Sequence, residues 1–159
     1  MRTGFGIDVH ALGGTPPLLL CGVVVDDARG LVGTSDADVA AHALCDALLG
    51  AAVLGDVGTH FPSGRDDFAD ADSMDLLARV VEMVVVEGLS VAHVDVTIIA
   101  QTVRVAPHRD AMIRNLAAVL GIDPSLVSVK ATTTDGLGVI GRDEGVAAMA
   151  VATLLSNRD

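Results

Sequence analysis

The sequence has no tryptophan or tyrosine, only three phenylalanines and only two cysteines. A core without large aromatic rings must be filled by Ala, Val, Leu and Ile, so we expect thin layers in close contact. Two cysteines form no disulfide framework. The sequence also lacks an apolar run of about 18 residues and a charged N-terminal leader, so we expect a cytoplasmic, soluble protein with no membrane partner.

Positive charge is also scarce. The chain has 21 Asp and Glu against 10 Lys and Arg, which gives a net charge of −11. No basic run is present that could follow a phosphate backbone, so we expect no nucleic-acid partner. A phosphorylated substrate would need local help from metal ions, a few placed cations and backbone amides.

The length of 159 residues predicts a single domain over residues 1–159. Apolar residues make up 51% of the chain, which is high for one small domain and predicts buried contacts between subunits.

Hydrophobic periodicity and turn residues predict strands and helices that follow one another along the whole chain. The expected strands cover residues 2–10, 18–20, 23–25, 94–101 and 127–131, and the expected helices cover residues 35–54, 73–87 and 107–121. Residues 56–72 have the composition of a loop, and residues 146–155 fit a helix or a strand equally well. This order favours an α/β (α+β) sandwich in which helices cover one side of a four-stranded mixed sheet.

Asp8 and His10 are the first residues that indicate chemistry. Residues two apart in a strand point to the same side, so this pair presents a carboxylate and an imidazole together. If His42 projects from the following helix, Zn²⁺ would have three protein ligands and an open fourth position, as in catalytic zinc sites. The spacing alone also fits a surface Asp and a hydrogen-bonded His. Asp38 and Asp46, one helical turn on either side of His42, would orient its imidazole or lie in solvent.

A second polar cluster covers residues 130–138 and 141–145. Three consecutive threonines and several glycines offer hydroxyl and amide groups to phosphate oxygens, while Lys130 and Arg142 supply positive charge. Asp135 is a hard oxygen ligand that suits Mg²⁺. Taken alone, this segment is equally consistent with a polar turn that contains a capping threonine.

Together these clusters resemble the 2-C-methyl-D-erythritol 2,4-cyclodiphosphate synthase family over nearly the whole chain. The resemblance is carried by Gly6–His10, Ser35–Val39 leading to His42–Leu44, Asp46–Gly50, Leu54–Gly58, Asp95–Gln101 and Lys130–Glu144. Six blocks in the family's order make the resemblance specific.

The resemblance implies a phosphorus–oxygen lyase of the non-mevalonate isoprenoid pathway that assembles as a homotrimer with active sites at subunit interfaces. The substrate would be 4-diphosphocytidyl-2-C-methyl-D-erythritol 2-phosphate, and the products the cyclic diphosphate and CMP. By matched position, Asp8, His10 and His42 would hold one Zn²⁺ per subunit, and Asp135 would meet a Mg²⁺ or Mn²⁺ ion.

The resemblance also assigns roles to residues outside the metal sites. Thr133 would stabilise the transition state, with Thr34 at a second catalytic position. Substrate-binding positions would be Ser35, Asp56, Val57, Gly58, Phe61, Ser63, Ala100, Arg104, Val105, Ala106, Ala131, Thr132, Thr134, Val139 and Arg142. The family also has a hydrophobic cavity on the threefold axis that can hold an isoprenoid diphosphate, which makes such a ligand a possible partner.

The chain departs from the family pattern at several of these positions. Thr34 replaces a histidine, so it can donate a hydrogen bond but carries no charge. Ser63 replaces an aspartate, and Asp135 is a shortened form of the usual glutamate. Val103–Arg104 replaces a Pro-Lys pair, and Asp143 replaces a glycine and adds negative charge beside Arg142.

These departures leave two further hypotheses open. In the first, the chain is a catalytically weakened trimeric homologue that binds metal and cytidine nucleotides. In the second, it is a zinc hydrolase that transfers phosphoryl groups to water.

Overall fold

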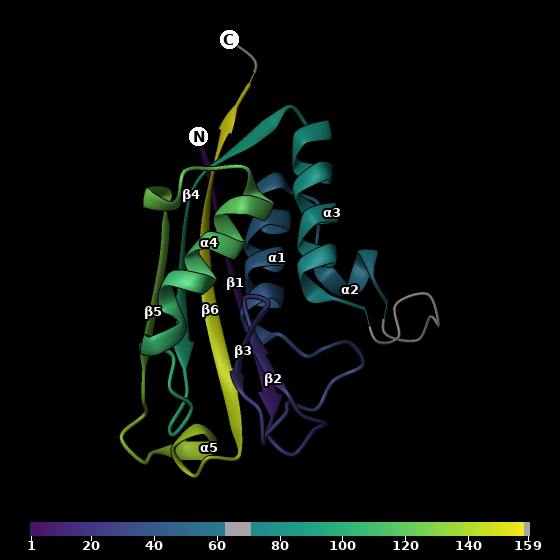
Figure 1. Cartoon of the computed structure of the whole chain (residues 1–159). Helices are drawn as coiled ribbons and strands as arrows, with labels where there is room; N and C mark the ends of the chain where they lie inside the picture. The colour runs from purple at the N-terminus through teal and green to yellow at the C-terminus, as the bar shows by residue number, and fades with distance from the viewer. Residues whose placement is uncertain (63–70, 158–159) are drawn as a thin grey trace.

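The computed structural model describes residues 1–62 and 71–157. Four strands form one mixed sheet, in the order β1-β6-β4-β5 (Figure 1). Strands β4 and β5 are parallel, whereas β6 is antiparallel to both β1 and β4. The strands are β1 (Arg2–Ala11), β4 (Leu89–Ile99), β5 (Val127–Thr132) and β6 (Gly145–Ser156).

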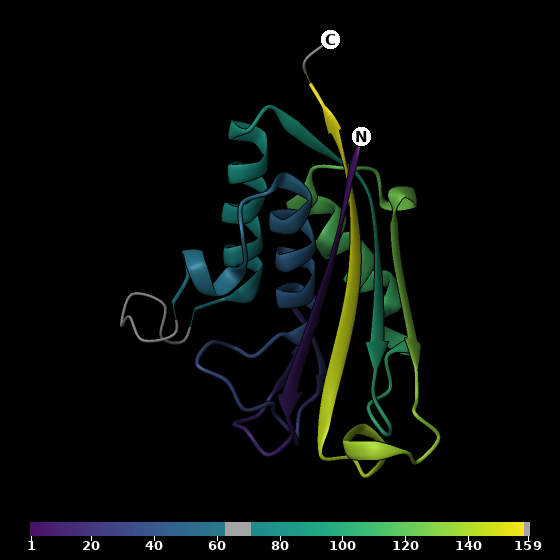
Figure 2. The same ribbon diagram turned by 180° about the vertical axis from the view of Figure 1, so that it is seen from behind.

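Three helices, α1 (Val39–Ala52), α3 (Ser73–Val86) and α4 (Arg109–Leu120), cover one face of this sheet. Seen from behind, the sheet lies in front of them, and none of the helices in the described part of the chain covers its other face (Figure 2). The smaller elements are the hairpin β2 (Leu18–Leu20) and β3 (Val23–Asp26), the short helices α2 (Val57–His60) and α5 (Gly138–Gly141), and the 3₁₀ turns η2 (Ala106–His108) and η3 (Pro124–Leu126). The expected four-stranded mixed sheet with helices on one side is confirmed.

Several predicted element boundaries were wrong. Helix α1 begins at Val39 instead of Ser35, because the carboxylate of Asp38 accepts hydrogen bonds from the Ala40 and Ala41 amides and caps the helix. It ends at Ala52, where Val53 adopts a left-handed conformation with φ 65°.

Other corrections concern segments whose structure depends on tertiary contacts. Residues 57–60, predicted as loop, form α2, capped by Asp56. Strand β4 begins at Leu89, five residues earlier than expected, and Pro107 lies in η2, just before α4. Residues 146–155, which periodicity left undecided, lie in β6 between β1 and β4. Among the described residues, no helix is both long enough and apolar enough to cross a membrane.

Strand β1 and helix α1 pack closely against each other. Gly4 and Gly6 point toward α1, and a Cβ atom built on either glycine would overlap the carbonyl oxygen of Ala47 or Ala43. The residues of α1 at this contact are small and completely buried. Because Asp8 and His10 continue the same face of β1, this contact holds α1 at the distance from which His42 can reach them.

This packing makes Gly6→Ala a test of the contact. The added methyl group would force α1 away from β1, so we expect the free energy of unfolding to fall by about 1–3 kcal/mol. Gly50→Ala, in the same helix, is the control: nothing lies within 4 Å of a Cβ built there, and it should stabilise the helix by about 0.5–1 kcal/mol. Urea denaturation of both variants measures the difference, and equal stabilities would contradict the close contact.

Candidate active site

Asp8, His10 and His42 come together where β1 passes the first turns of α1. The Oδ2 atom of Asp8 lies 3.0 Å from Nε2 of His10 and 3.1 Å from Nδ1 of His42. One ligand atom from each of the three residues lies within 4.8 Å of the others, and the residues are partly buried. The structure therefore forms the predicted triad from a strand and a helix that are separated in the sequence.

The donor set fits a zinc ion. Two imidazole nitrogens and one carboxylate oxygen are usual zinc ligands, and bonds of about 2.0–2.1 Å in a tetrahedron place ligand atoms roughly 3.3 Å apart. Nδ1 of His10 lies 2.6 Å from the carbonyl oxygen of Val32. This nitrogen therefore carries the proton and donates it to the carbonyl, which leaves Nε2 available for the ion.

The charges of the triad reinforce one another. Burial alone would raise the pKa of Asp8, but hydrogen bonds from His10 and His42 outweigh it and hold the pKa of this carboxyl well below its usual range. The hydrogen bond to Asp8 raises the pKa of His10, although burial opposes that shift. Asp8 is thus ionised at neutral pH and ready to bind a cation.

Of the two alternatives for Asp38 and Asp46, orientation of His42 or exposure to solvent, the structure supports neither. Asp38 is completely buried, and besides capping α1 its carboxylate accepts a hydrogen bond from the Gly22 amide at 2.7 Å. Asp46 accepts one from the Val57 amide at 2.8 Å and so holds α2 against α1. Neither residue lies in solvent as a free acid.

The partner of His42 is Ser73, a residue that the sequence did not single out. The Nε2 atom of His42 lies 3.0 Å from the Ser73 hydroxyl oxygen, and that hydroxyl contacts Asp36. Ser73 is the first residue of α3, and no periodicity of the sequence indicates that this helix begins beside His42.

A small cavity of about 180 Å³ adjoins His42. It brings together predicted site residues from the loop before α1 and from α2, namely Thr34, Ser35, Val57, Gly58 and Phe61. Asp56, next to them, binds the Thr59 amide and hydroxyl through its carboxylate. Ser63 lies outside the described residues.

A larger cavity, of about 580 Å³, lies between the segment after β4 and the end of β5. It is lined by two sets of predicted substrate-binding residues, Ala100, Arg104, Val105 and Ala106 from the first segment and Ala131, Thr132 and Thr133 from the second. The structure therefore gathers these residues around one space.

The turn after β5 places Thr133 beside Asp135. The Thr133 hydroxyl donates to Oδ1 of Asp135 at 3.1 Å and accepts from the Asp135 amide at 3.2 Å. Asp135 has a φ of 51°, a conformation that Asp tolerates better than most residues. No second group of three metal-ligating residues occurs within residues 1–62 and 71–157, so an ion at Asp135 would take its other ligands from substrate phosphates and water.

The two cations of this segment are ion-paired. Arg142 binds Glu144 in a bidentate manner, with distances of 2.8 and 3.0 Å, and Lys130 pairs with Asp95. These pairs reduce the positive charge available to phosphates, which increases the need for metal ions.

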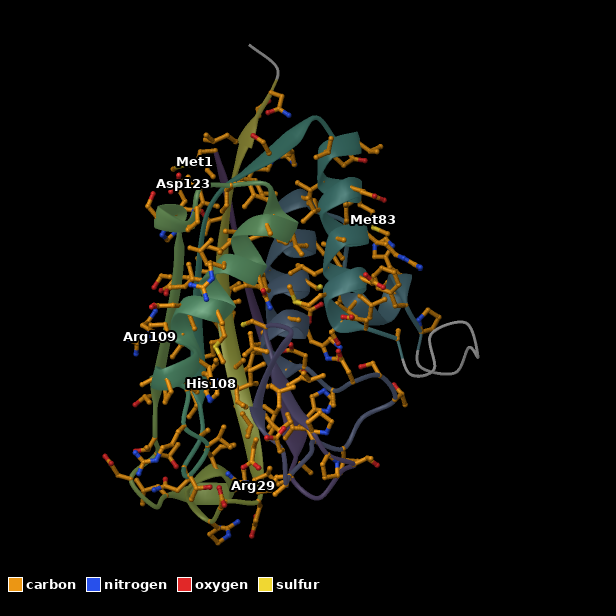
Figure 3. The ribbon with its side chains drawn as sticks, in the orientation of Figure 1. Met1, Arg29, Met83, His108, Arg109 and Asp123 are labelled. Atoms are coloured by element: carbon orange, nitrogen blue, oxygen red, sulfur yellow. The ribbon has the colours of Figure 1, made fainter. Side chains whose placement is uncertain are left out.

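Asp143, which follows Arg142 in the sequence, forms its ion pair with Arg29. Its carboxylate lies 3.2 Å from Nη1 of Arg29 and accepts the Thr102 hydroxyl at 2.8 Å. Arg29, labelled in Figure 3, thus ties the turn before β6 to the segment that lines the larger cavity.

The metal triad and the Thr133 turn lie at opposite edges of the sheet. Val9, between the two triad residues of β1, is in register with Ala147 of β6. Ala147 pairs in turn with Ile99 of β4, and Ile99 pairs with Thr132 at the end of β5. Three strand spacings of about 4.8 Å separate the two edges by ~14 Å. Val139 lines a third cavity, of about 270 Å³, together with Val9 and the triad residue His10.

Asp8→Asn tests the triad. The substitution removes the anionic ligand of the ion. Loss of a residue that only contacts a ligand lowers metal affinity by about 10–100-fold, so loss of a ligand itself should lower Zn²⁺ affinity by more than about 100-fold. It should also lower the pKa of His10 in the metal-free protein, because Asp8 is what raises it. Chelator competition and an NMR titration of His10 measure both effects, with Asp75→Asn on the exposed face of α3 as the control. An unchanged affinity would contradict the assignment.

Comparison with known proteins agrees with this geometry. The model of the YgbB family matches residues 1–155. The 2-C-methyl-D-erythritol 2,4-cyclodiphosphate synthase of Moorella thermoacetica is 54% identical over 98% of this chain and 95% of its own length, and that of Symbiobacterium thermophilum is 51% identical over 97% and 98%. A CDP complex of Plasmodium falciparum IspF superposes with a TM-score of 0.86 at 30% identity, over 99% of this chain and 97% of that one. The chain belongs to the YgbB family.

Proposed function

We propose that this protein is a 2-C-methyl-D-erythritol 2,4-cyclodiphosphate synthase of the non-mevalonate isoprenoid pathway. It converts 4-diphosphocytidyl-2-C-methyl-D-erythritol 2-phosphate to the cyclic diphosphate and CMP. The observation that carries the proposal is the Asp8, His10 and His42 triad, in a chain about half identical to two synthases of that name along nearly its whole length.

Asp8, His10 and His42 would hold Zn²⁺, and Asp135 would bind Mg²⁺ or Mn²⁺ together with substrate phosphates. These ions would neutralise phosphate oxygens and fix an in-line geometry when bound. The donor set of the triad supports zinc, and the single carboxylate of Asp135 supports a hard, partly hydrated ion.

The reaction joins two phosphates of one molecule. An oxygen of the 2-phosphate forms a bond to the β-phosphorus, the bond from that phosphorus to the bridging oxygen breaks, and its electron pair leaves with CMP. The nucleophile is already an anion, so the reaction needs no side chain as a base, and positioning supplies much of the rate.

The protein's contribution is to fold the substrate back on itself. Thr34, Ser35, Val57, Gly58 and Phe61 surround the cavity beside His42, which suits the methylerythritol part. The cavity between residues 100–107 and 131–133 suits the cytidine, and the CDP complex of the Plasmodium falciparum relative supports a cytidine nucleotide as ligand. The Thr133 hydroxyl would then donate to the phosphates between them.

The proposed assembly is a homotrimer with active sites between subunits. One substrate must reach both the triad and the Thr133 turn, which lie ~14 Å apart on opposite edges of one sheet. A closed ring of head-to-tail contacts places one edge beside the opposite edge of the next chain. The sheet face without helices also exposes apolar side chains suited to subunit contacts, namely Phe5, Ile7, Val9 and Met149.

The remaining parts of the proposal concern the setting of the enzyme. One contiguous hydrophobic core joins the helices to the sheet, which supports a single domain over residues 1–159. Cys21 and Cys45 are buried free thiols, as expected of a protein of the reducing cytoplasm. The apolar sheet face would line a central cavity in the trimer, where an isoprenoid diphosphate is the proposed ligand.

The decisive test is incubation of the chain with the authentic substrate, Zn²⁺ and Mg²⁺. We expect release of CMP and a cyclic product, identified by mass spectrometry, with activity lost on chelation. A linear product heavier by one water would show a hydrolase instead.

Binding of CDP without turnover would favour the catalytically weakened homologue. In that case, Thr34→His should raise turnover by about 100-fold, the usual value of one placed transition-state donor. A parent chain that is already fast would rule out this alternative.

Phe5→Asp tests the assembly. A charge on the exposed sheet face should shift the protein from trimer to monomer and abolish turnover, while Zn²⁺ binding by the intrachain triad persists. Sedimentation velocity and chelator competition measure the two effects, and Val53→Asp, at an exposed position after α1, is the control. A trimer that survives Phe5→Asp would place the subunit contacts elsewhere.

A further inference from the structure

The imidazole of His42 is held on both sides. Its Nδ1 atom lies 3.1 Å from Oδ2 of Asp8, on the side of the metal triad. Its Nε2 atom, on the far side of the ring, lies 3.0 Å from the Ser73 hydroxyl oxygen and 3.3 Å from that of Ser35. Ser73 is the closer of the two and is completely buried.

The direction of these hydrogen bonds follows from the surroundings of Asp36. The Oδ2 atom of Asp36 accepts the Ser73 amide at 3.0 Å, and its Oδ1 atom accepts the Asp38 amide at 3.2 Å as well as the Ser73 hydroxyl. Because the hydroxyl has one proton and gives it to Asp36, its oxygen can only accept from His42. Nε2 of His42 therefore carries a proton, and Nδ1 is the nitrogen left to give its lone pair to an ion.

We propose that Ser73 and Asp36 are positioning residues for the metal: they fix His42 in the tautomer and ring orientation that direct Nδ1 at the ion. The proposal deepens the zinc site of the proposed function and rests on it. A carboxylate, a hydroxyl and an imidazole form one chain of hydrogen bonds that ends at the ion, which extends the usual carboxylate and histidine pairing by one serine.

The chain of hydrogen bonds joins three separate parts of the fold. Asp36 lies in the loop before α1, His42 lies in α1, and Ser73 opens α3. The Asp36 amide also donates to the Ala71 carbonyl oxygen at 3.3 Å, so the loop and the start of α3 are held together at two points. The other imidazole of the triad, on His10, is fixed by the Val32 carbonyl oxygen in the same manner.

Ser73→Ala and Asp36→Asn test the proposal with Zn²⁺ alone as the probe. Ser73→Ala removes the acceptor from Nε2 of His42. Asp36→Asn replaces one carboxylate oxygen by an NH₂ group, which donates hydrogen bonds and cannot accept them. In either orientation of the amide, at least one of the hydrogen bonds that Asp36 accepts from Ser73 and Asp38 is therefore lost. We expect each variant to bind Zn²⁺ about 10–100-fold more weakly in competition with a chromophoric chelator.

Asp72→Ala is the matched control. Asp72 caps α3 one residue before Ser73, and its carboxylate accepts the Met74 amide at 2.8 Å without contacting His42. Asp72→Ala should destabilise the protein at the start of α3 by about 1 kcal/mol, because the cap is lost, and should leave Zn²⁺ affinity unchanged. Thermal unfolding of the metal-free variants shows whether a weakened affinity merely follows a weakened fold.

A spectroscopic measurement separates positioning from a structural role. In the Zn²⁺-loaded parent, the Nε2–H proton of His42 should exchange slowly with solvent in ¹H–¹⁵N spectra of the ring, because the buried Ser73 hydroxyl accepts it. Ser73→Ala should speed this exchange and shift the Nε2 resonance, whereas Asp72→Ala should retain the parent's spectrum. If Ser73→Ala does not fold, Asp36→Asn decides by the same measurements.

Parental Zn²⁺ affinity and parental exchange of the His42 Nε2–H proton in both variants would overturn the proposal. A parent chain that binds no Zn²⁺ would overturn it together with the zinc site. None of these measurements uses the substrate, so a parent that binds Zn²⁺ through this chain of hydrogen bonds and yet releases no CMP would refute the proposed reaction and leave this inference intact.

Discussion

The close contact between β1 and α1 determines where the rest of the site can lie. Gly4 and Gly6 let the backbone of α1 approach the strand directly, and the alanines of α1 fill the remaining space. A larger side chain on either surface would move His42 away from Asp8, and the ligand atoms would no longer share an ion. The scarcity of large side chains is thus the condition that allows a metal centre between a strand and a helix.

Local patterns predicted the architecture, whereas the triad was predicted from the Asp8 and His10 spacing together with the resemblance to the synthase family. Asp8 and His10 are two apart in a strand, and His42 follows in a helix that the apolar run and its capping residues predict. Strand β6 could not be assigned from periodicity, because its inward face consists of Val146, Leu154 and alanines while much of its outward face is also apolar. Only its position between two other strands explains that composition.

The contacts that orient His42 could not be predicted for a different reason. Asp38 and Asp46 have the right helical spacing, yet the first caps its own helix and the second holds α2. Ser73 acts from a separate helix, and only the packing of α3 against α1 brings it near. The partners of Arg142 and Asp143 could not be predicted from the sequence either, because Arg142 pairs with Glu144 and Asp143 pairs with the distant Arg29.

The separation of the triad from the Thr133 turn has a genetic consequence in the proposed trimer. Each junction draws one part from each of two neighbouring chains, so a chain damaged only in its triad still offers a sound nucleotide-binding half. A mixed ring built from that chain and one with the reciprocal defect contains at least one junction in which both halves are intact. Two inactive alleles would therefore restore growth to a cell that carries both.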